Sequence, residues 1–156
     1  KEIQQHKILL KAIGLSTPSM RNFRNEWVHE VVGNEGNGKP KYLKRNAYEA
    51  ELDGLDYALF FYSKEQYVFR ASGAIADAIA NEIPLIVLEH PFFNNLFEYA
   101  GSIGYLCKDV SEMKVLIKKI IETPQDFITE RKLQKQNLKK AQELMSVNSI
   151  VKDLCS

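Results

Sequence analysis

The sequence has few cysteines and no long apolar run. Its two cysteines, Cys107 and Cys155, lie far apart and outside any metal-ligand spacing, which argues against a disulfide framework or a cysteine-bound metal and favours a reducing compartment. No apolar segment approaches the roughly 20 residues needed to span a bilayer. The first residues show no pattern of a charged region, an apolar region and a cleavage site, so we expect no signal peptide there. We therefore expect a soluble, cytoplasmic protein.

The sequence also lacks an excess of charge of either sign. With 21 Lys and Arg against 20 Asp and Glu, the formal net charge is +1, so no nucleic-acid partner is expected and any anion site must be local. There is no Walker loop, GxGxxG, HExxH or nucleophile elbow, and His6 and His29 have no partners in the sequence. We expect no cofactor and no metal.

The length of the chain fits one domain. A chain of 156 residues can bury a core without disulfides or metals, so we predict a single domain over residues 1–156, with a helical C-terminal segment at 126–156. The chain begins at Lys1 without a methionine and directly in helical sequence. We expect a piece of a longer protein.

The stretch from Asp56 to Glu89 predicts a strand, a polar loop, a helix and a second strand. The aromatic run at 57–62 and the run at 85–88 are short and unbroken, as in buried strands of a parallel sheet. The helix between them has one apolar stripe and should end before Pro84. That stripe consists of Ala71, Ala74, Ile75, Ala78 and Ile79. The spacing allows a right-handed βαβ crossover.

The rest of the chain continues the alternation of helices and strands. The further predicted elements are a helix at 2–13 closed by Gly14, a strand at 27–32, a glycine-rich loop at 33–38, a helix at 46–55, a loop at 90–95, a helix at 96–100 ended by Gly101, a strand at 104–107, and a helix that Asp109 or Ser111 caps and Pro124 ends. The sequence therefore predicts an α/β fold, with helices on both faces of a parallel sheet of about four strands.

Arg70, Ser72 and Gly73 stand at the predicted start of the first crossover helix. A phosphate there would meet free backbone N–H groups, the positive end of the helix dipole, a hydroxyl and a guanidinium. The alternative is that Ser72 only caps the helix and Arg70 is a surface residue. Ligands of open α/β sheets bind at the carboxyl ends of the strands, which favours the site.

Five more residues are candidates for this site, and one further pair was considered as a catalytic couple. Asp77, in the same helix, suits two ribose hydroxyls, or it lies on a solvated face. Tyr62 and Tyr67 flank the loop and suit stacking on a base or sugar, or they belong to the core. Gly33 and Asn34 open a loop that allows close approach of a ligand, or an ordinary hairpin. Glu89 and His90 are neighbours that point to opposite faces of a strand, which argues against an acid/base couple.

Three segments together resemble the donor-binding half of a GT-B glycosyltransferase of the large retaining family four, the glycosyl transferases group 1. They are residues 56–62 (DYALFFY), 67–80 (YVFRASGAIADAIA) and 83–87 (IPLIV). The later Gly104-Tyr105 and the helix at 109–122 match the end of the same pattern. The resemblance covers about residues 27–121 and implies a Rossmann-like three-layer α/β/α domain, which is one half of a GT-B fold.

The resemblance also implies roles for the candidate residues. Ser72 and Gly73 would hold the diphosphate of a nucleotide-sugar donor, and Asp77 would replace the ribose-binding glutamate of the family. Gly33-Asn34 would lie near the phosphates or base. We assign Arg70 the catalytic role of neutralising charge on the leaving diphosphate, without a bound metal.

The chain departs from the family pattern at three places. Phe69 stands where the family has the first acidic residue of its E-x7-E motif, and Ile83 replaces a glycine. The Arg and Lys pair of the family is not found and would fall before or near Lys1. In the family, that acidic side chain contacts the sugar. Phe69 cannot make the same contacts.

The resemblance implies a hexosyltransferase of bacterial glycan biosynthesis that transfers sugar to a glycan or lipid-linked acceptor. Its partners would be a nucleotide sugar and the N-terminal acceptor-binding domain of the full chain, and the isolated piece would be weakly active or inactive. The alternative is a non-catalytic, flavodoxin-like binding module. A third interpretation places the basic segment at 131–140 on an anionic membrane at its inner face, unless that segment is a solvated helix face.

Overall fold

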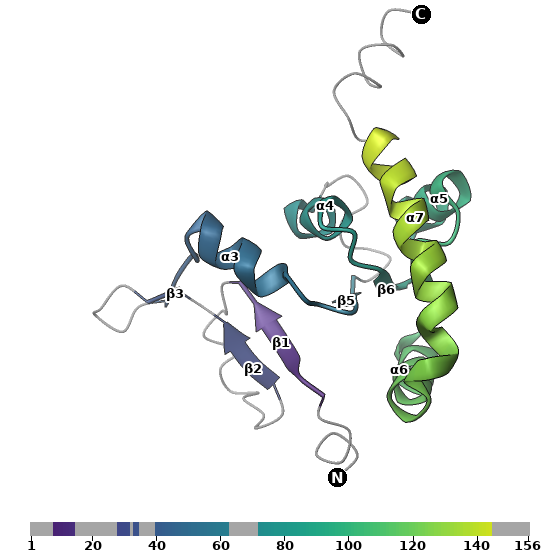
Figure 1. Cartoon of the computed structure of the whole chain (residues 1–156), viewed down its shortest axis with the longest axis horizontal. Helices are drawn as coiled ribbons and strands as arrows, with labels where there is room; N and C mark the ends of the chain where they lie inside the picture. The colour runs from purple at the N-terminus through teal and green to yellow at the C-terminus, as the bar shows by residue number, and fades with distance from the viewer. Residues whose placement is uncertain (1–7, 15–27, 32, 35–39, 63–71, 145–156) are drawn as a thin grey trace, which may run out of the picture. The chain divides into compact units, whose positions relative to one another are not determined.

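The computed structural model is an α/β protein with two small parallel sheets (Figure 1). The structure describes residues 8–14, 28–31, 33–34, 40–62 and 72–144. The chain divides into two compact units, Lys1–Gly54 and Leu55–Ser156. Each unit is described by itself below. The prediction of a single domain over residues 1–156 stays a prediction.

The first unit contains a parallel pair of strands, β1 (Leu10–Ile13) and β2 (Val28–Val31), with Leu10 opposite Val28. The strand β2 was predicted. The helix predicted at 2–13 is wrong at residues 10–13, which form the strand β1. Residues 8–13 form a short segment that is apolar except for Lys11. Such a segment fits a strand as well as a helix, and pairing with β2 decides for the strand. Gly14, expected to cap a helix, instead follows the strand and donates its N–H to the carbonyl of Val31 at 3.2 Å.

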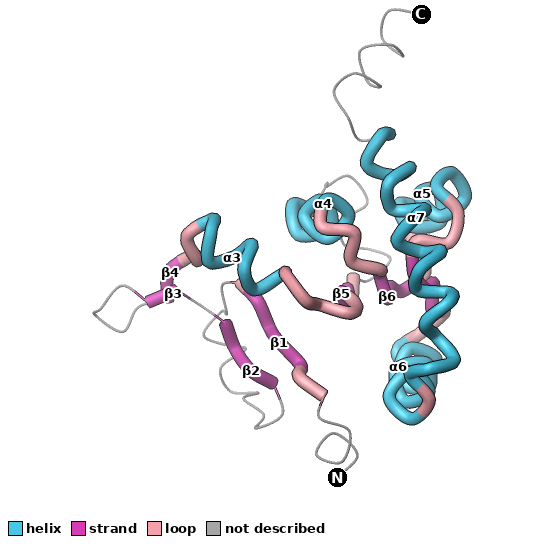
Figure 2. The backbone as a smooth tube through the Cα atoms, viewed as in Figure 1, coloured by secondary structure: helices cyan, strands magenta, loops and turns pink. Residues whose placement is uncertain are grey.

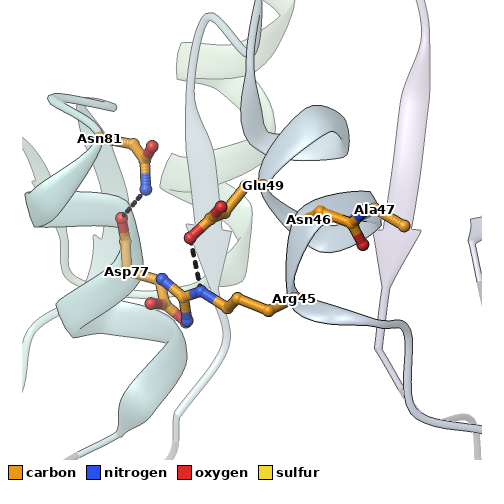
Figure 3. Close-up of polar contacts among 6 residues, drawn as sticks. All are labelled: Arg45, Asn46, Ala47, Glu49, Asp77 and Asn81. Carbon is orange, nitrogen blue, oxygen red and sulfur yellow. Dashed lines mark hydrogen bonds and ion pairs between the residues drawn. The ribbon is translucent and has the colours of Figure 1, made fainter.

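The first unit also contains a hairpin and a helix. Strand β3 (Gly33–Asn34) pairs antiparallel with β4 (Pro40–Lys41), so the hairpin alternative for the glycine-rich segment is confirmed at its two ends. Helix α3 (Arg45–Leu52) confirms the helix predicted at 46–55. Within α3, Arg45 Nε donates to Glu49 Oε1 at 2.6 Å, one helical turn on (Figure 3).

The second unit is built on a three-stranded parallel sheet in the order β5-β6-β7. Figure 2 labels the first two of these strands, β5 and β6. Its strands are β5 (Ala58–Phe60), β6 (Leu85–Leu88) and β7 (Gly104–Cys107), and all three were predicted. The predicted strand at 27–32 pairs instead with β1, so the described strands do not form one four-stranded sheet. Strands β6 and β7 approach closely at Gly104, where a Cβ would lie 1.9 Å from the carbonyl oxygen of Leu85.

Helices cover both faces of this sheet. They are α4 (Gly73–Ala80), α5 (Pro91–Ala100), α6 (Val110–Glu122), the 3-10 turn η1 (Pro124–Phe127) and α7 (Ile128–Leu144). Met113 of α6 packs with Ile86 and Cys107 on one face. Side chains alternate along a strand, so Leu85 and Val87 face the other side. Right-handed crossovers place α4 and α5 on that side. This arrangement confirms the predicted α/β fold and is compatible with a Rossmann-like fold.

Helix α7 packs against α4 and α5 and uses amide side chains to do so. Asn137 Nδ2 donates to the carbonyl of Ser102 at 2.9 Å, and Gln142 Nε2 donates to the carbonyl of Ile79 at 2.8 Å. The first bond ties α7 to the segment that follows α5, and the second ties it to the last turn of α4, where the Ile79 carbonyl also accepts from the amide of Glu82. In the described residues, no helix has the combination of length and apolarity that crossing a bilayer demands.

The start of α5 corrects a second prediction. A loop was expected at 90–95, whereas α5 already begins at Pro91. Proline suits the first position of a helix, because that position needs no N–H donor, and His90 caps the first turn with its side chain. Gly101 ends α5 with a φ of 86°, as predicted. Of the predicted C-terminal segment, residues 145–156 lie outside the described residues.

Candidate functional site

Three helices begin at one edge of the sheet in the second unit. Strands β5, β6 and β7 are parallel and in register, so their carboxyl ends share an edge. The helices α4, α5 and α6 start at this edge, with Ser72, His90 and Asp109 as their N-caps. The amides of a first helical turn have no partner within the helix, so each start is a place where an anion can bind unless a side chain closes it.

Two of these helix starts are closed by their own side chains. Asp109 Oδ1 accepts hydrogen bonds from the amides of Ser111 and Glu112 at 2.7 and 2.9 Å. His90 Nδ1 accepts from the amide of Phe92 at 3.2 Å. The carboxylate of Asp109 also places a negative charge at the start of α6, which repels an anionic ligand.

The start of α4 is arranged differently. The side chain of its N-cap, Ser72, makes no capping hydrogen bond. Its Oγ lies 2.8 Å from the phenolic oxygen of Tyr62, and the two hydroxyls are hydrogen-bonded. Gly73, the first helical residue, is exposed, and a Cβ built there would meet no atom of the described part of the chain within 4 Å. Within the described residues, the first turn of α4 is therefore left without a side-chain cap and with space beside it.

The ring of Tyr62 is fixed by neighbouring aromatic rings. It stacks on Phe93, with 6.4 Å between the ring centroids and 14° between the planes, and it lies 5.6 Å from the ring of Phe60. Phe93 is fully buried in α5 and meets the ring of His90 edge-on at 6.3 Å. Because Phe93 contacts both rings, Tyr62 and His90 belong to one aromatic cluster at the carboxyl edge of the sheet.

Asp77 lies on the same face of α4 as Gly73. The two residues are four positions apart, which places their Cβ positions about 5–6 Å apart along the helix. The Asp77 side chain is half-buried, and its backbone carbonyl accepts from the amide of Asn81 at 3.0 Å and from Asn81 Nδ2 at 2.8 Å (Figure 3). A ligand at the first turn of α4 that extends along this face would reach the Asp77 carboxylate.

The structure places four of the predicted site residues together in the second unit: Tyr62, Ser72, Gly73 and Asp77. The predicted Arg70 and Tyr67 lie outside the described residues. Gly33 and Asn34 belong to the first unit, where they form strand β3. Their proposed roles, like those of the other site residues, stay predictions.

Two residues of this edge were not predicted as members of the site. Phe93 was placed in a loop, and His90 was considered only as a catalytic partner of Glu89. The signal that was available for His90 is the proline that follows it, because a polar residue before proline is typical of a helix start. For Phe93, correct recognition of α5 was needed, since only then does the side chain point from a helix onto the sheet.

The shifted pKa values of the second unit belong to its buried interior. Burial raises the pKa of the Cys107 thiol, which argues against a nucleophilic role. Burial also raises the pKa values of Tyr57 and Tyr105, both of which pack against the core under α6. In the part of the chain that the structure describes, no three His, Cys, Asp or Glu side chains gather as metal ligands would.

Comparisons of the chain with protein-family models, with curated proteins and with solved structures give no match. The interpretation of the site therefore rests on the residues of this chain and on their geometry. The start of α4 is suited to an anion, because it combines an uncapped helix start, a fixed pair of hydroxyls and a glycine with space beside it among the described residues. The Asp77 carboxylate, one turn further on, would repel an anion and suits neutral hydroxyl groups instead.

Proposed function

We propose that this chain is the donor-binding domain of a glycosyltransferase and holds the diphosphate of a nucleotide sugar at the start of α4. One observation carries the proposal. Ser72, the residue that would ordinarily cap α4, is hydrogen-bonded to Tyr62 and makes no cap. The amides of Gly73 and Ala74 and the positive end of the helix dipole would then face a ligand in place of a side chain, whereas the amide of Ile75 donates to the carbonyl of Ser72 at 3.1 Å.

The chemical role of this site is electrostatic. In sugar transfer, the bond between the sugar and the diphosphate breaks, and negative charge builds up on the departing diphosphate. Backbone N–H groups and a helix dipole that already point at that charge stabilise the transition state more than the ground state. Arg70 would add a guanidinium with two donors for the same oxygens. No covalent intermediate on the protein is required.

The other predicted residues complete the proposed donor site. The Asp77 carboxylate would accept hydrogen bonds from the two ribose hydroxyls, because it lies one turn beyond Gly73 on the same face of α4. Support for a sugar donor comes from the sequence resemblance and not from the fold, since one fold serves many functions. The acceptor would be a glycan or lipid-linked molecule bound by a further domain, at the cytoplasmic side of a membrane.

Titration calorimetry with UDP, GDP and ADP tests this proposal on the chain as it is. We expect one of these nucleotides to bind, and Ser72→Ala to weaken its binding about three- to tenfold, the amount that the loss of one hydrogen-bonding group supplies. The matched control is Ser111→Ala, at the start of α6, which should bind as the wild type does. If none of the three nucleotides binds, the proposal is overturned in favour of a non-catalytic, flavodoxin-like module.

A further inference from the structure

Helix α7 lies along the amino edge of the sheet in the second unit. Its Gln134 Nε2 lies 3.4 Å from the carbonyl oxygen of Gly104, the first residue of β7, and its Arg131 pairs with Asp56, which precedes β5. The proposed nucleotide site lies at the carboxyl edge, the opposite end of the strands. The side of α7 that does not contact the sheet therefore points away from that site.

The two sides of α7 differ in composition. The side that packs on the rest of the unit consists of buried residues at helical spacing, Gln134, Asn137, Leu138 and Ala141. The other side carries four exposed lysines, Lys132, Lys135, Lys139 and Lys140. The first three follow one stripe, because residues three, four and seven positions apart lie on the same side of a helix. We call these four lysines the basic face of α7.

The charge of the basic face is not neutralised by neighbouring carboxylates. Lys139 Nζ lies 3.8 Å from Glu82 Oε1, but exposed pairs of this kind are weak. The other three lysines of the face make no ion pair among the residues that the structure describes. Glu143, near the end of α7, offsets one of the four charges, so the exposed side of the helix keeps a net positive charge.

Exposed apolar side chains lie among these lysines. Leu133 is 51% exposed and shares one flank of α7 with Lys140, seven positions further on. Ile128, which is 44% exposed, lies on the flank of Lys132. A bilayer with anionic lipids presents charged headgroups at its surface and apolar chains beneath them, so it can contact both kinds of side chain. The backbone of a nucleic acid offers phosphates but no apolar layer.

We propose that the basic face of α7 docks on an anionic lipid bilayer. The lysines contact the headgroup phosphates, and Leu133 reaches the boundary between the headgroups and the acyl chains. Each lysine near such a surface contributes about a fivefold gain in binding. In this orientation the carboxyl edge of the sheet stays open to the aqueous phase, from which a nucleotide arrives. The docking does not depend on the proposed nucleotide site.

Co-sedimentation with lipid vesicles tests the proposal on the chain as it is. We expect binding to vesicles of phosphatidylcholine and phosphatidylglycerol, weaker binding as salt is added, and none to phosphatidylcholine alone. Lys132→Gln should weaken binding about fivefold, and the double variant Lys132→Gln/Lys135→Gln about 25-fold. The matched control is Lys108→Gln, an exposed lysine that directly follows β7 at the carboxyl edge, which should bind vesicles as the wild type does.

Three results would overturn the docking on a bilayer. They are no binding to the anionic vesicles, equal binding to both kinds of vesicle, and wild-type binding by the double lysine variant. Binding to duplex DNA without binding to vesicles would also overturn it, in favour of a polyanion as the partner. Nucleotide affinity, measured separately by calorimetry, should be the same in the lysine variants and the wild type, so failure of the docking and failure of the proposed function are distinguishable.

Discussion

The phenolic oxygen of Tyr62 and the Oγ of Ser72 are hydrogen-bonded at 2.8 Å. This bond joins the end of β5 to the start of α4 and occupies the hydroxyl that would otherwise cap the helix. The neighbouring helix α6 shows the usual arrangement, in which Asp109 caps its own first turn. The difference between the two helix starts is why we place the ligand at α4 and not at α6.

Removing the phenolic hydroxyl tests whether Tyr62 keeps Ser72 away from its own helix. In Tyr62→Phe, the Ser72 hydroxyl is released and can cap α4, so a capping bond replaces the lost hydrogen bond and stability should change by less than about 1 kcal/mol. Nucleotide affinity should fall about three- to tenfold, because the cap then competes with the ligand. Calorimetry and thermal melting measure the two effects.

The control for this substitution is Tyr99→Phe, which removes the same group from an exposed position on α5. It should change neither the affinity nor the melting temperature. If Tyr62→Phe also binds nucleotide like the wild type, Tyr62 has no part in holding the helix start open.

Two glycines of the second unit should respond oppositely to alanine. In Gly73→Ala, the added methyl group meets no atom of the described residues within 4 Å, so the protein should melt at or slightly above the wild-type temperature. The methyl group would stand beside the first turn of α4, where the phosphate is expected, and nucleotide affinity should fall at least tenfold. Wild-type affinity in this variant would show that no ligand approaches at Gly73.

In Gly104→Ala, the added Cβ would lie 1.9 Å from the carbonyl oxygen of Leu85, on a backbone with φ of 151°. Backbone atoms of the central strand cannot move aside cheaply, so we expect a loss of about 3 kcal/mol or more, measured by urea unfolding. A loss below about 1 kcal/mol would mean that β6 and β7 can separate without cost.

Glu82 offers a stabilising substitution. It follows α4 with a φ of 55°, and the amides of Glu82 and Ile83 donate to the carbonyls of Ile79 and Ala78, which forms a Schellman motif. Glycine adopts this conformation without strain, so Glu82→Gly should stabilise the protein by about 0.5–1 kcal/mol.

The matched control is Glu82→Ala, which likewise removes the exposed ion pair with Lys139 but keeps the side-chain strain. It should leave the melting temperature unchanged or slightly lower. A gain of the same size in both variants would assign the effect to the ion pair and not to the backbone.

The raised pKa of Tyr105 predicts that the protein loses folding stability at alkaline pH. Burial and the hydrogen bond that its hydroxyl donates to Glu130 at 2.8 Å raise its pKa above the ordinary value. The folded state therefore holds the phenolic proton more tightly than the unfolded state. This stabilisation is complete below about pH 10, the unfolded pKa, and is lost as pH rises toward the folded one.

Urea unfolding at about pH 8 and about pH 10.5 measures this effect. The wild type should lose stability between the two values, and Tyr105→Phe should lose less, because it has no phenol to ionise. Tyr57, whose pKa burial also raises, retains part of the dependence. An equal loss in both proteins would contradict the role of Tyr105.

The sequence predicted the fold of the second unit well because its signals there are strong. The strands β6 and β7 are unbroken apolar runs, and α6 combines a capping Asp109 with a regular apolar stripe that includes Met113. The signals at β1 were weaker, since a six-residue segment that is apolar except for Lys11 is too short to show a period that separates strand from helix. Its pairing with β2, fifteen or more residues away, decided the outcome.

The candidate site was predicted in part. Ser72, Gly73 and Asp77 follow from a helix start at the carboxyl end of a strand, a position that the βαβ pattern specifies. The pairing of Ser72 with Tyr62 and the burial of His90 could not be predicted, because both depend on how α5 packs Phe93 against the end of β5. Contacts of this kind are set by tertiary packing and leave no periodic signal in the sequence.

The central claim is that the first-turn amides of α4 bind the diphosphate. Amide chemical shifts during a titration with UDP, GDP or ADP test it most directly, with the start of α6 as an internal control, since Asp109 already occupies its amides. We predict that the amide resonances of Gly73 and Ala74 move most and saturate with the same dissociation constant that calorimetry gives. Unmoved resonances at Gly73 and Ala74 in the presence of a bound nucleotide would contradict the claim.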